Sequence, residues 1–169
     1  MSARNYNFMN SWTNAEAAAY SCLTQATGTV DGKGAYLGYL PAGMADVWAM
    51  TSGAGGGNEQ TLWATELGTV HMLAEVECHY RVREAAQAWS MAILRATPYG
   101  NTKLADPGNL VTVRIRQGGI PQPITLEPIQ LAGEAAQVQM LWTMRLGLEI
   151  VFLTGGRTAE QAETEEPES

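Results

Sequence analysis

The sequence predicts an α+β domain in which one mostly antiparallel sheet of about four to five strands carries two helices on its apolar face. Apolar and polar residues alternate with a period of two along residues 70–81 and 139–153, which is typical of strands buried on one side. Residues 83–96 instead repeat their apolar positions every three or four residues, which indicates an amphipathic helix. Such clean alternation favours antiparallel pairing of the strands.

The first predicted element is a helix over residues 13–27. Its alanine-rich sequence favours helix formation, and Thr13 with Glu16 fits a capping box at the helix start. The next strand is predicted at residues 46–52, and the glycine-rich stretch at 51–60 is interpreted as a connecting loop. Its glycines resemble those of a phosphate-binding loop, but the Lys-Ser or Lys-Thr ending of that motif is absent.

Strand 70–81 separates its side chains by chemistry. Its even-numbered residues are mostly apolar and face the core, which makes Cys78 a buried structural thiol. Its odd-numbered residues include two glutamates and both histidines of the chain, His71 and His79. Because the histidines point away from Cys78, neither can act as its base, and we expect no catalytic residue.

The stretch HMLAEVECH at residues 71–79 also raises the question of a metal site. Glu77 and His79 share one face and can contact a single ion, whereas His71 lies about 13 Å along the strand from Glu75. A zinc site normally needs three or four convergent ligands, and the sequence supplies only this pair. We therefore expect no metal and no cofactor, and we interpret these residues as a polar sheet face. Their expected cross-strand partners are Arg114, Arg116 and Arg145.

The remaining elements follow from the same two periodicities. The helix over residues 83–96 is expected to end before Pro98, because proline cannot continue a helix. A shorter strand is predicted at residues 110–117, with its arginines on the polar side. Most of the tryptophans in or beside these elements are expected in the core. They are Trp48, Trp63, Trp89 and Trp142.

Length and charge divide the chain into three predicted parts. Residues 1–11 are expected to form a flexible N-terminal arm, residues 12–155 a single domain, and residues 156–169 an acidic disordered tail. From residue 157 onward the chain holds five glutamates and one arginine, so this tail carries −4 of the net charge of −7. No basic stripe is present that would neutralise nucleic-acid phosphates, and no apolar run approaches the roughly 20 residues of a membrane span. With only two cysteines, a reducing compartment is the simpler expectation.

Five stretches follow one another in a recognisable order. They are the helix SWTNAEAAAYSCLTQA, the strand LPAGMADVWAMTSG, the strand and helix TVHMLAEVECHYRVREAAQAWSMAILRA, the strand NLVTVRIRQGG, and the closing strand QMLWTMRLGLEIVFL. This arrangement, which covers residues 12–153, resembles the tail terminator (tail completion) proteins of long-tailed bacteriophages. The chain departs from the small members of that family in long loops at 51–66 and 98–109 and in its acidic tail.

The resemblance implies a structural protein of the virion tail or neck, assembled in the host cytoplasm, and no enzymatic activity. Proteins of this family form hexameric rings that cap the tail tube, end tail polymerisation and join the tail to the head connector. The implied partners are further copies of the chain, the tail-tube protein, the head–tail connector protein and, in a contractile tail, the sheath protein. DNA would pass through the ring without specific binding, which suits an acidic protein, and no membrane is involved.

Charge and side-chain direction, rather than the resemblance, select six candidates for contacts between subunits. They are Glu75, Glu77, Arg81, Arg83, Arg114 and Arg116. Two other functions stay open at this point. One is another phage neck or tail protein, such as a connector, a stopper or a tube-like subunit. The other is a small metal-dependent enzyme or ligand-binding domain that uses Glu77 and His79.

Overall fold

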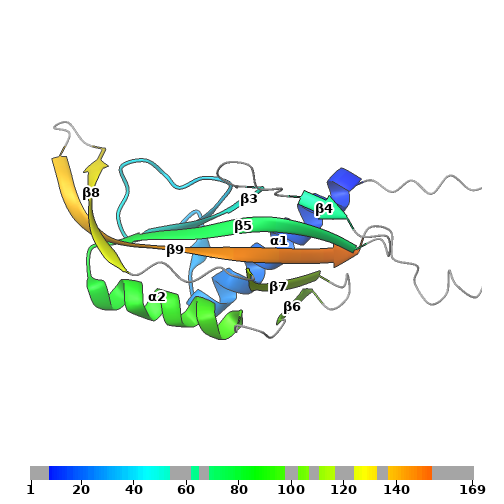
Figure 1. The fold of residues 1–169 in the computed structure, drawn as a ribbon. Helices are drawn as coiled ribbons and strands as arrows, with labels where there is room; N and C mark the ends of the chain where they lie inside the picture. The colour runs from blue at the N-terminus through cyan, green and yellow to red at the C-terminus, as the bar shows by residue number, and fades with distance from the viewer. Residues whose placement is uncertain are drawn as a thin grey trace, which may run out of the picture.

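The computed structural model describes residues 8–53, 62–64, 69–97, 103–106, 111–116, 124–132 and 137–153. Within these ranges the chain forms two helices and one nine-stranded sheet, so the predicted α+β class is confirmed (Figure 1). The predicted acidic tail at 156–169 and most of the predicted arm at 1–11 lie outside the described residues.

Helix α1 spans Phe8–Thr27 and therefore begins five residues before the predicted start at 13. The capping box is wrong, because Thr13 lies inside the helix. Glu16 instead accepts hydrogen bonds from Trp12 Nε1, at 3.3 Å, and from the hydroxyl of Ser52 on strand β3. Trp12 also packs against the hydrophobic core, so tertiary contacts extend the helix into the segment predicted to be a flexible arm.

Helix α2 spans Arg83–Ala96, as the sequence predicts. Its N-cap, Val82, makes no side-chain capping bond. Glu84 in the first turn and Arg95 in the last turn complement the helix dipole instead.

The sheet is larger than predicted and is mixed. Its strands are β1 (Val30–Asp31), β2 (Gly34–Leu37), β3 (Val47–Ser52), β4 (Leu62–Ala64), β5 (Thr69–Tyr80), β6 (Lys103–Asp106), β7 (Val111–Ile115), β8 (Thr125–Leu131) and β9 (Gln137–Leu153). The main order is β1-β2-β3-β5-β9-β7-β6, with β4 paired to β5 and β8 paired to β9. Pairs β1–β2 and β2–β3 are parallel, and the others are antiparallel. The prediction of about four to five mostly antiparallel strands is therefore wrong in number and right for only part of the sheet.

Strand β9 is the centre of the sheet. Twelve of its residues pair with β5 along one edge, while β8 and β7 pair with successive parts of its other edge. The predicted alternation is confirmed on β5 and on the part of β9 that pairs with it. Even-numbered residues such as Cys78 and Leu148 are fully buried there.

Both helices contribute to one buried cluster together with the even-numbered side of β5 and β9. Helix α1 supplies Ala15, Ala19, Tyr20 and Leu23, and helix α2 supplies Ala86, Trp89, Ile93 and Ala96. Trp48 of β3 is completely buried between the rings of Tyr20 and Trp89, at centroid distances of 5.8 and 6.1 Å. The small alanines let the helices approach the sheet closely.

One part of the sheet extends beyond its neighbours. Residues 137–141 of β9 pair with β8, whereas the pairing of β9 with β5 begins only at Trp142. The result is a two-stranded hairpin, residues 125–131 and 137–141, which we call the hairpin arm. Figure 1 shows it bending away from the body at one end of the molecule.

Candidate functional site: the polar face of the central sheet

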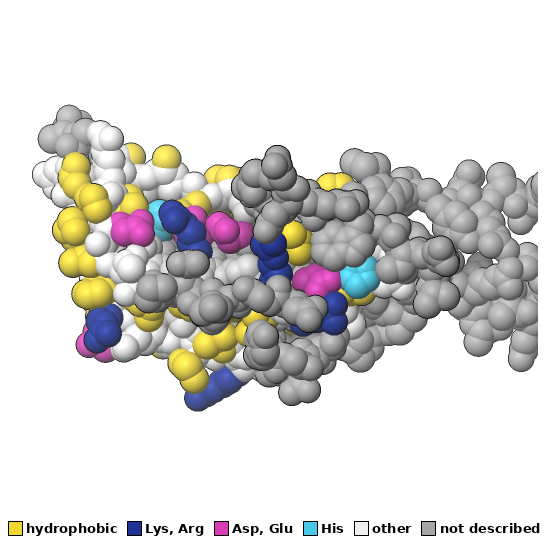
Figure 2. Space-filling model, in the orientation of Figure 1, with side chains coloured by type: hydrophobic (Ala, Val, Ile, Leu, Met, Phe, Trp, Pro, Cys, Tyr) yellow, Lys and Arg dark blue, Asp and Glu magenta, His cyan; other side chains and the backbone are white. Residues whose placement is uncertain are grey.

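The odd-numbered residues of β5 and β9 form one polar face. Pairing across the strands places Glu77 opposite Arg145. On the other edge of β9, Arg114 of β7 lies opposite Glu149. Figure 2 shows charged side chains of both signs and the two histidines in a row across this face of the molecule. The sequence-based expectation of a cross-strand partner for residues 71–79 is confirmed for Arg145, which bonds Glu77, whereas Arg114 bonds Glu149 of β9.

The first cluster on this face ties three strands together. Glu149 of β9 is 4% exposed, and its Oε2 accepts a hydrogen bond from Arg114 Nε at 2.8 Å. Its Oε1 lies 2.5 Å from Nδ1 of His71 on β5. Burial alone would raise the pKa of the Glu149 carboxyl, but the hydrogen bonds from Arg114 and His71 outweigh burial, so the pKa is lowered. This carboxylate therefore stays ionised.

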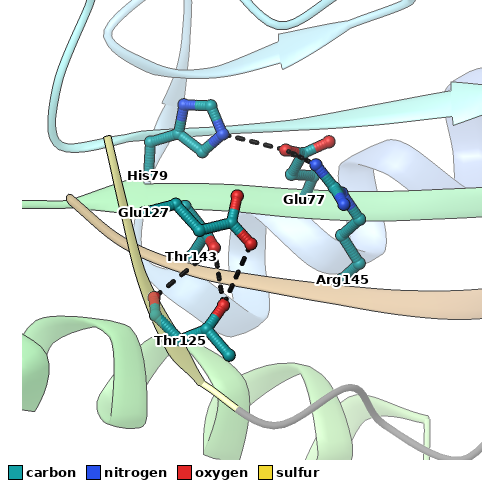
Figure 3. A network of polar contacts seen from close by, with 6 residues as sticks. All are labelled: Glu77, His79, Thr125, Glu127, Thr143 and Arg145. Atoms are coloured by element: carbon teal, nitrogen blue, oxygen red, sulfur yellow. Dashed lines mark hydrogen bonds and ion pairs between the residues drawn. The ribbon is translucent and has the colours of Figure 1, made fainter. Parts of the chain in front are cut away.

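The second cluster lies further along the same face (Figure 3). Oε1 of Glu77 lies 2.8 Å from His79 Nε2 and accepts a hydrogen bond from Arg145 Nη2 at 3.1 Å. The bond to His79 is the main reason that the pKa of Glu77 is lowered to about 2, with Arg145 adding to the effect against the opposing influence of burial. Hydrogen bonding to Glu77 likewise raises the pKa of Arg145.

A separate group of polar side chains lies beside this cluster, toward the hairpin arm. The Thr125 hydroxyl donates to Glu127 Oε1 at 3.0 Å and lies 3.2 Å from the hydroxyl of Thr143 (Figure 3). Thr143 is also the cross-strand neighbour of His79. The polar face is therefore continuous from the body of the sheet to the base of the arm.

The structure does not bring the six predicted contact residues to one surface. Glu75, Glu77 and Arg114 belong to strands of the polar face, and Arg116 directly follows β7, with its backbone N–H bonded to Gly147 of β9. The other two lie elsewhere. Arg81 follows the end of β5 and pairs with Asp46, and Arg83 begins α2, with its guanidinium 5.6 Å from the ring centre of Trp142.

Sequence reasoning missed several of the pairs that hold these charges, among them His71 with Glu149 and Arg81 with Asp46. Strand spacing puts His71 about 13 Å from Glu75 and so out of reach of an ion at Glu77 and His79, and in the structure His71 belongs to a different cluster, with Glu149. The period-two pattern of β9 places Glu149 on its polar side. The sequence does not show how β9 is aligned with β5 and β7, and this alignment brings Glu149 to His71 and Arg114. Asp46 has no sequence signal, since its role depends on a left-handed backbone with φ of 59°.

The arrangement balances charge and leaves little for reactive chemistry. His79 and Arg145 both contact the same oxygen of Glu77, so a metal ion at the Glu77–His79 pair would have to displace Arg145. Within the described ranges no group of three or more His, Cys, Asp or Glu side chains converges on a metal site. Cys78 lies on the opposite side of β5, where burial raises the pKa of its thiol to about 12.

A second surface feature is apolar and lies at the hairpin arm. Leu126, Val138 and Met140 are 44%, 67% and 48% exposed on one side of the arm. Two further exposed apolar side chains, Tyr39 and Met44, belong to the loop that contacts the arm. These five are the majority of the eight large apolar side chains exposed among the described residues, so exposed apolar surface is concentrated at this end.

Comparisons with known proteins do not assign a family, because no family model and no curated protein matches the chain. Among the described residues, neither helix combines the length and apolar character needed to cross a membrane.

Proposed function

We propose that this protein is a structural component of a tailed-phage virion, a tail terminator that forms a ring on the end of the tail tube. Its predicted partners are five further copies of itself, the tube protein, the head–tail connector and, in a contractile tail, the sheath. The element order on which the resemblance rests agrees with the α1, β3, β5–α2, β7 and β9 elements of the structure.

The observation that carries the proposal is the hairpin arm. A two-stranded hairpin is marginally stable by itself, and contiguous apolar surface on a soluble protein usually marks a contact site. Val138 and Met140 are even-numbered residues of β9, and the even-numbered side of β9 faces the core further along the strand. In the arm, however, α1 and α2 do not cover this side, so both residues are exposed. An arm of this kind suits a protein that gains its full stability on assembly.

The polar face fits a supporting role. Its two main carboxylates, Glu77 and Glu149, are already held by arginines of the same chain. Arg114 and Arg145 stay 40% and 49% exposed, so each can still contact a neighbouring surface from the edge of its cluster. Such contacts set orientation between subunits more than they set affinity.

The test compares two methionines that are equally exposed. Met140 lies on the arm and Met91 on α2, and each is 48% exposed. Met140→Lys places a charge on the proposed contact surface and is expected to abolish ring formation, whereas Met91→Lys is expected to leave it intact. Native mass spectrometry and electron microscopy with purified tail tubes measure both outcomes.

A wild-type chain that is monomeric alone and inert toward tail tubes contradicts the proposal. Rings that bind the head connector but not the tube would instead identify another neck protein, such as a connector or stopper. A metal-dependent enzyme requires bound metal in the purified protein that is lost in Glu77→Ala and His79→Ala.

A further inference from the structure

The loop between β2 and β3, residues 38–46, starts with a hydrogen bond from the Gly38 N–H to the Met50 carbonyl of β3 and then makes two contacts with more distant parts of the chain. We call this loop the strap. In Figure 1 it runs out from β2 toward the end of β8 and returns to β3. At its middle, the backbone N–H of Ala132, directly after β8, donates to the carbonyl of Gly43 at 3.2 Å. At its end, Asp46 accepts a hydrogen bond from the backbone N–H of Arg81 at 3.0 Å.

The first point of contact requires glycine for two reasons. Gly43 has φ of 75°, a left-handed conformation that side chains disfavour. A Cβ atom at Gly43 would also lie 2.2 Å from the backbone N and 2.6 Å from the Cβ of Ala132. Because the closest atoms include the backbone of Ala132, which directly follows β8, any larger residue must push the strap away from this end of the arm.

The second point of contact stores backbone strain. Asp46 has φ of 59° and is the one non-glycine residue with positive φ in the described part of the chain. Its carboxylate binds the backbone N–H of Arg81 and lies 3.7 Å from the Arg81 guanidinium, which holds the strained conformation in place. The strap is thus anchored to the body at the end of β5 and to the arm at Ala132.

We propose that the strap is a latch that fixes the angle of the hairpin arm relative to the sheet. Apart from the strap, the arm is joined to the described body mainly by the continuous strand β9, which can bend and twist where β5 ends. The latch also connects the arm to the polar face, because Val47, directly after Asp46, pairs with His79 on β5. The relevance of the latch to ring assembly rests on the proposed function. The contact between the strap and the arm does not depend on it.

The experiment measures hydrogen exchange in two glycine variants of the full chain. Gly43→Ala and Gly38→Ala both place a side chain at a positive φ, 75° and 90°, but at Gly38 no atom lies within 4 Å of the added Cβ. Gly43→Ala is expected to speed amide exchange in the arm, residues 125–141, by about tenfold, with no change in residues 144–152. Gly38→Ala is expected to leave the exchange of the arm at its wild-type rate.

A second variant tests the same contact from the other side. Ala132→Pro removes the N–H that bonds to Gly43 and leaves the strap sequence unchanged. It is expected to reproduce the faster exchange of the arm and also to speed exchange in residues 38–46. Arm exchange that stays at the wild-type rate in Gly43→Ala and Ala132→Pro, or that rises equally in Gly38→Ala, overturns the latch. Hydrogen exchange can be measured on the unassembled chain, so its result does not depend on whether the protein forms rings.

Discussion

Two glutamates order the polar face at the level of single residues, and each holds one histidine and one arginine. Glu77 and Glu149 differ mainly in burial, since their side chains are 22% and 6% exposed. Both carboxylates have lowered pKa values because charged or polar donors reach their oxygens. Protonating either one would break these contacts, so both residues link stability to pH.

Glu77 provides the clearer pH prediction because its folded pKa is about 2, against an ordinary value of 4.5. A lowered folded pKa contributes stability that is fully present above the unfolded pKa and is lost as pH falls through the folded pKa. The stability difference between wild type and Glu77→Gln is therefore expected to be constant above pH 5 and to shrink steadily between about pH 4.5 and pH 2. Urea denaturation at a series of pH values measures it.

Glu75→Gln is the control for this experiment, because Glu75 lies two residues away on the same face of β5. Its stability difference from wild type is expected to vary much less over the same pH window. Equal pH dependence in both variants would contradict the assignment of the linkage to the Glu77 cluster.

Trp48 and Trp89 are both buried, yet replacing each by phenylalanine is expected to lower the free energy of unfolding by different amounts. Trp48 Nε1 donates to the Thr29 hydroxyl at 3.0 Å, whereas the buried Nε1 of Trp89 has no hydrogen-bond partner among the described residues. Both Trp→Phe changes lose ring volume, but only Trp48→Phe also loses a hydrogen bond. We expect Trp48→Phe to lower the free energy of unfolding by about 1–2 kcal/mol more than Trp89→Phe.

Thermal or urea unfolding followed by circular dichroism measures this difference, since the remaining tryptophans complicate fluorescence. A Trp89→Phe variant that is as destabilised as Trp48→Phe would show that the indole N–H of Trp89 is satisfied in solution.

At the level of elements, periodicity predicted the long segments and failed for the short ones. Strand β5, helix α2 and strand β9 are long enough to show a repeat, and their bounds are within two residues of the prediction. Strands β1, β2, β4 and β6 have two to four residues, which is too short for a pattern to appear. Strand β8 is not predicted by periodicity, because Pro121 and Pro123 precede it and Pro128 lies inside it.

The sequence predicted which residues of a strand lie on the polar face of the sheet, because successive side chains point to opposite faces. This alternation places Glu75, Glu77, His71 and His79 on one side of β5. It does not show which residues of the neighbouring strand β9 lie opposite them. Register is set by the whole sheet, and it places Glu149 opposite Leu73, diagonal to His71, so that the two side chains meet. The capping box failed because Trp12 packs on the core and prolongs α1.

Glu149 connects three strands, because it lies on β9 and contacts His71 of β5 and Arg114 of β7. Glu149→Gln keeps the shape of the side chain but leaves Arg114 and His71 without their carboxylate. With Arg114 partly exposed, we expect a loss of about 2 kcal/mol in the free energy of unfolding. Urea denaturation measures it, and Glu75→Gln, expected within about 0.5 kcal/mol of wild type, is the matched control. A Glu149→Gln variant as stable as that control would mean that the three-strand link contributes nothing.

For the whole molecule, we expect the proposed assembly to form without binding nucleic acid. The arm and the strap present apolar surface at one end of the molecule. The nine basic and twelve acidic residues before residue 157 give the body a net charge of −3. In the proposed ring, such subunits would repel DNA in the lumen, and the acidic tail, which carries −4 of the net charge of −7, would add to this repulsion.

The last prediction separates the body from the tail. The full chain and a chain ending at residue 156 are both expected to show no DNA binding at low ionic strength, because neither has a basic stripe that can release counterions. Fluorescence anisotropy with labelled duplex DNA measures this, over a series of salt concentrations. A variant with the five tail glutamates changed to lysine is the positive control, since each change adds two charges and turns the tail from −4 to +6. Salt-dependent DNA binding by the shortened chain would show that the body attracts DNA and that only the tail prevents binding. That result would contradict passive passage of DNA through the ring.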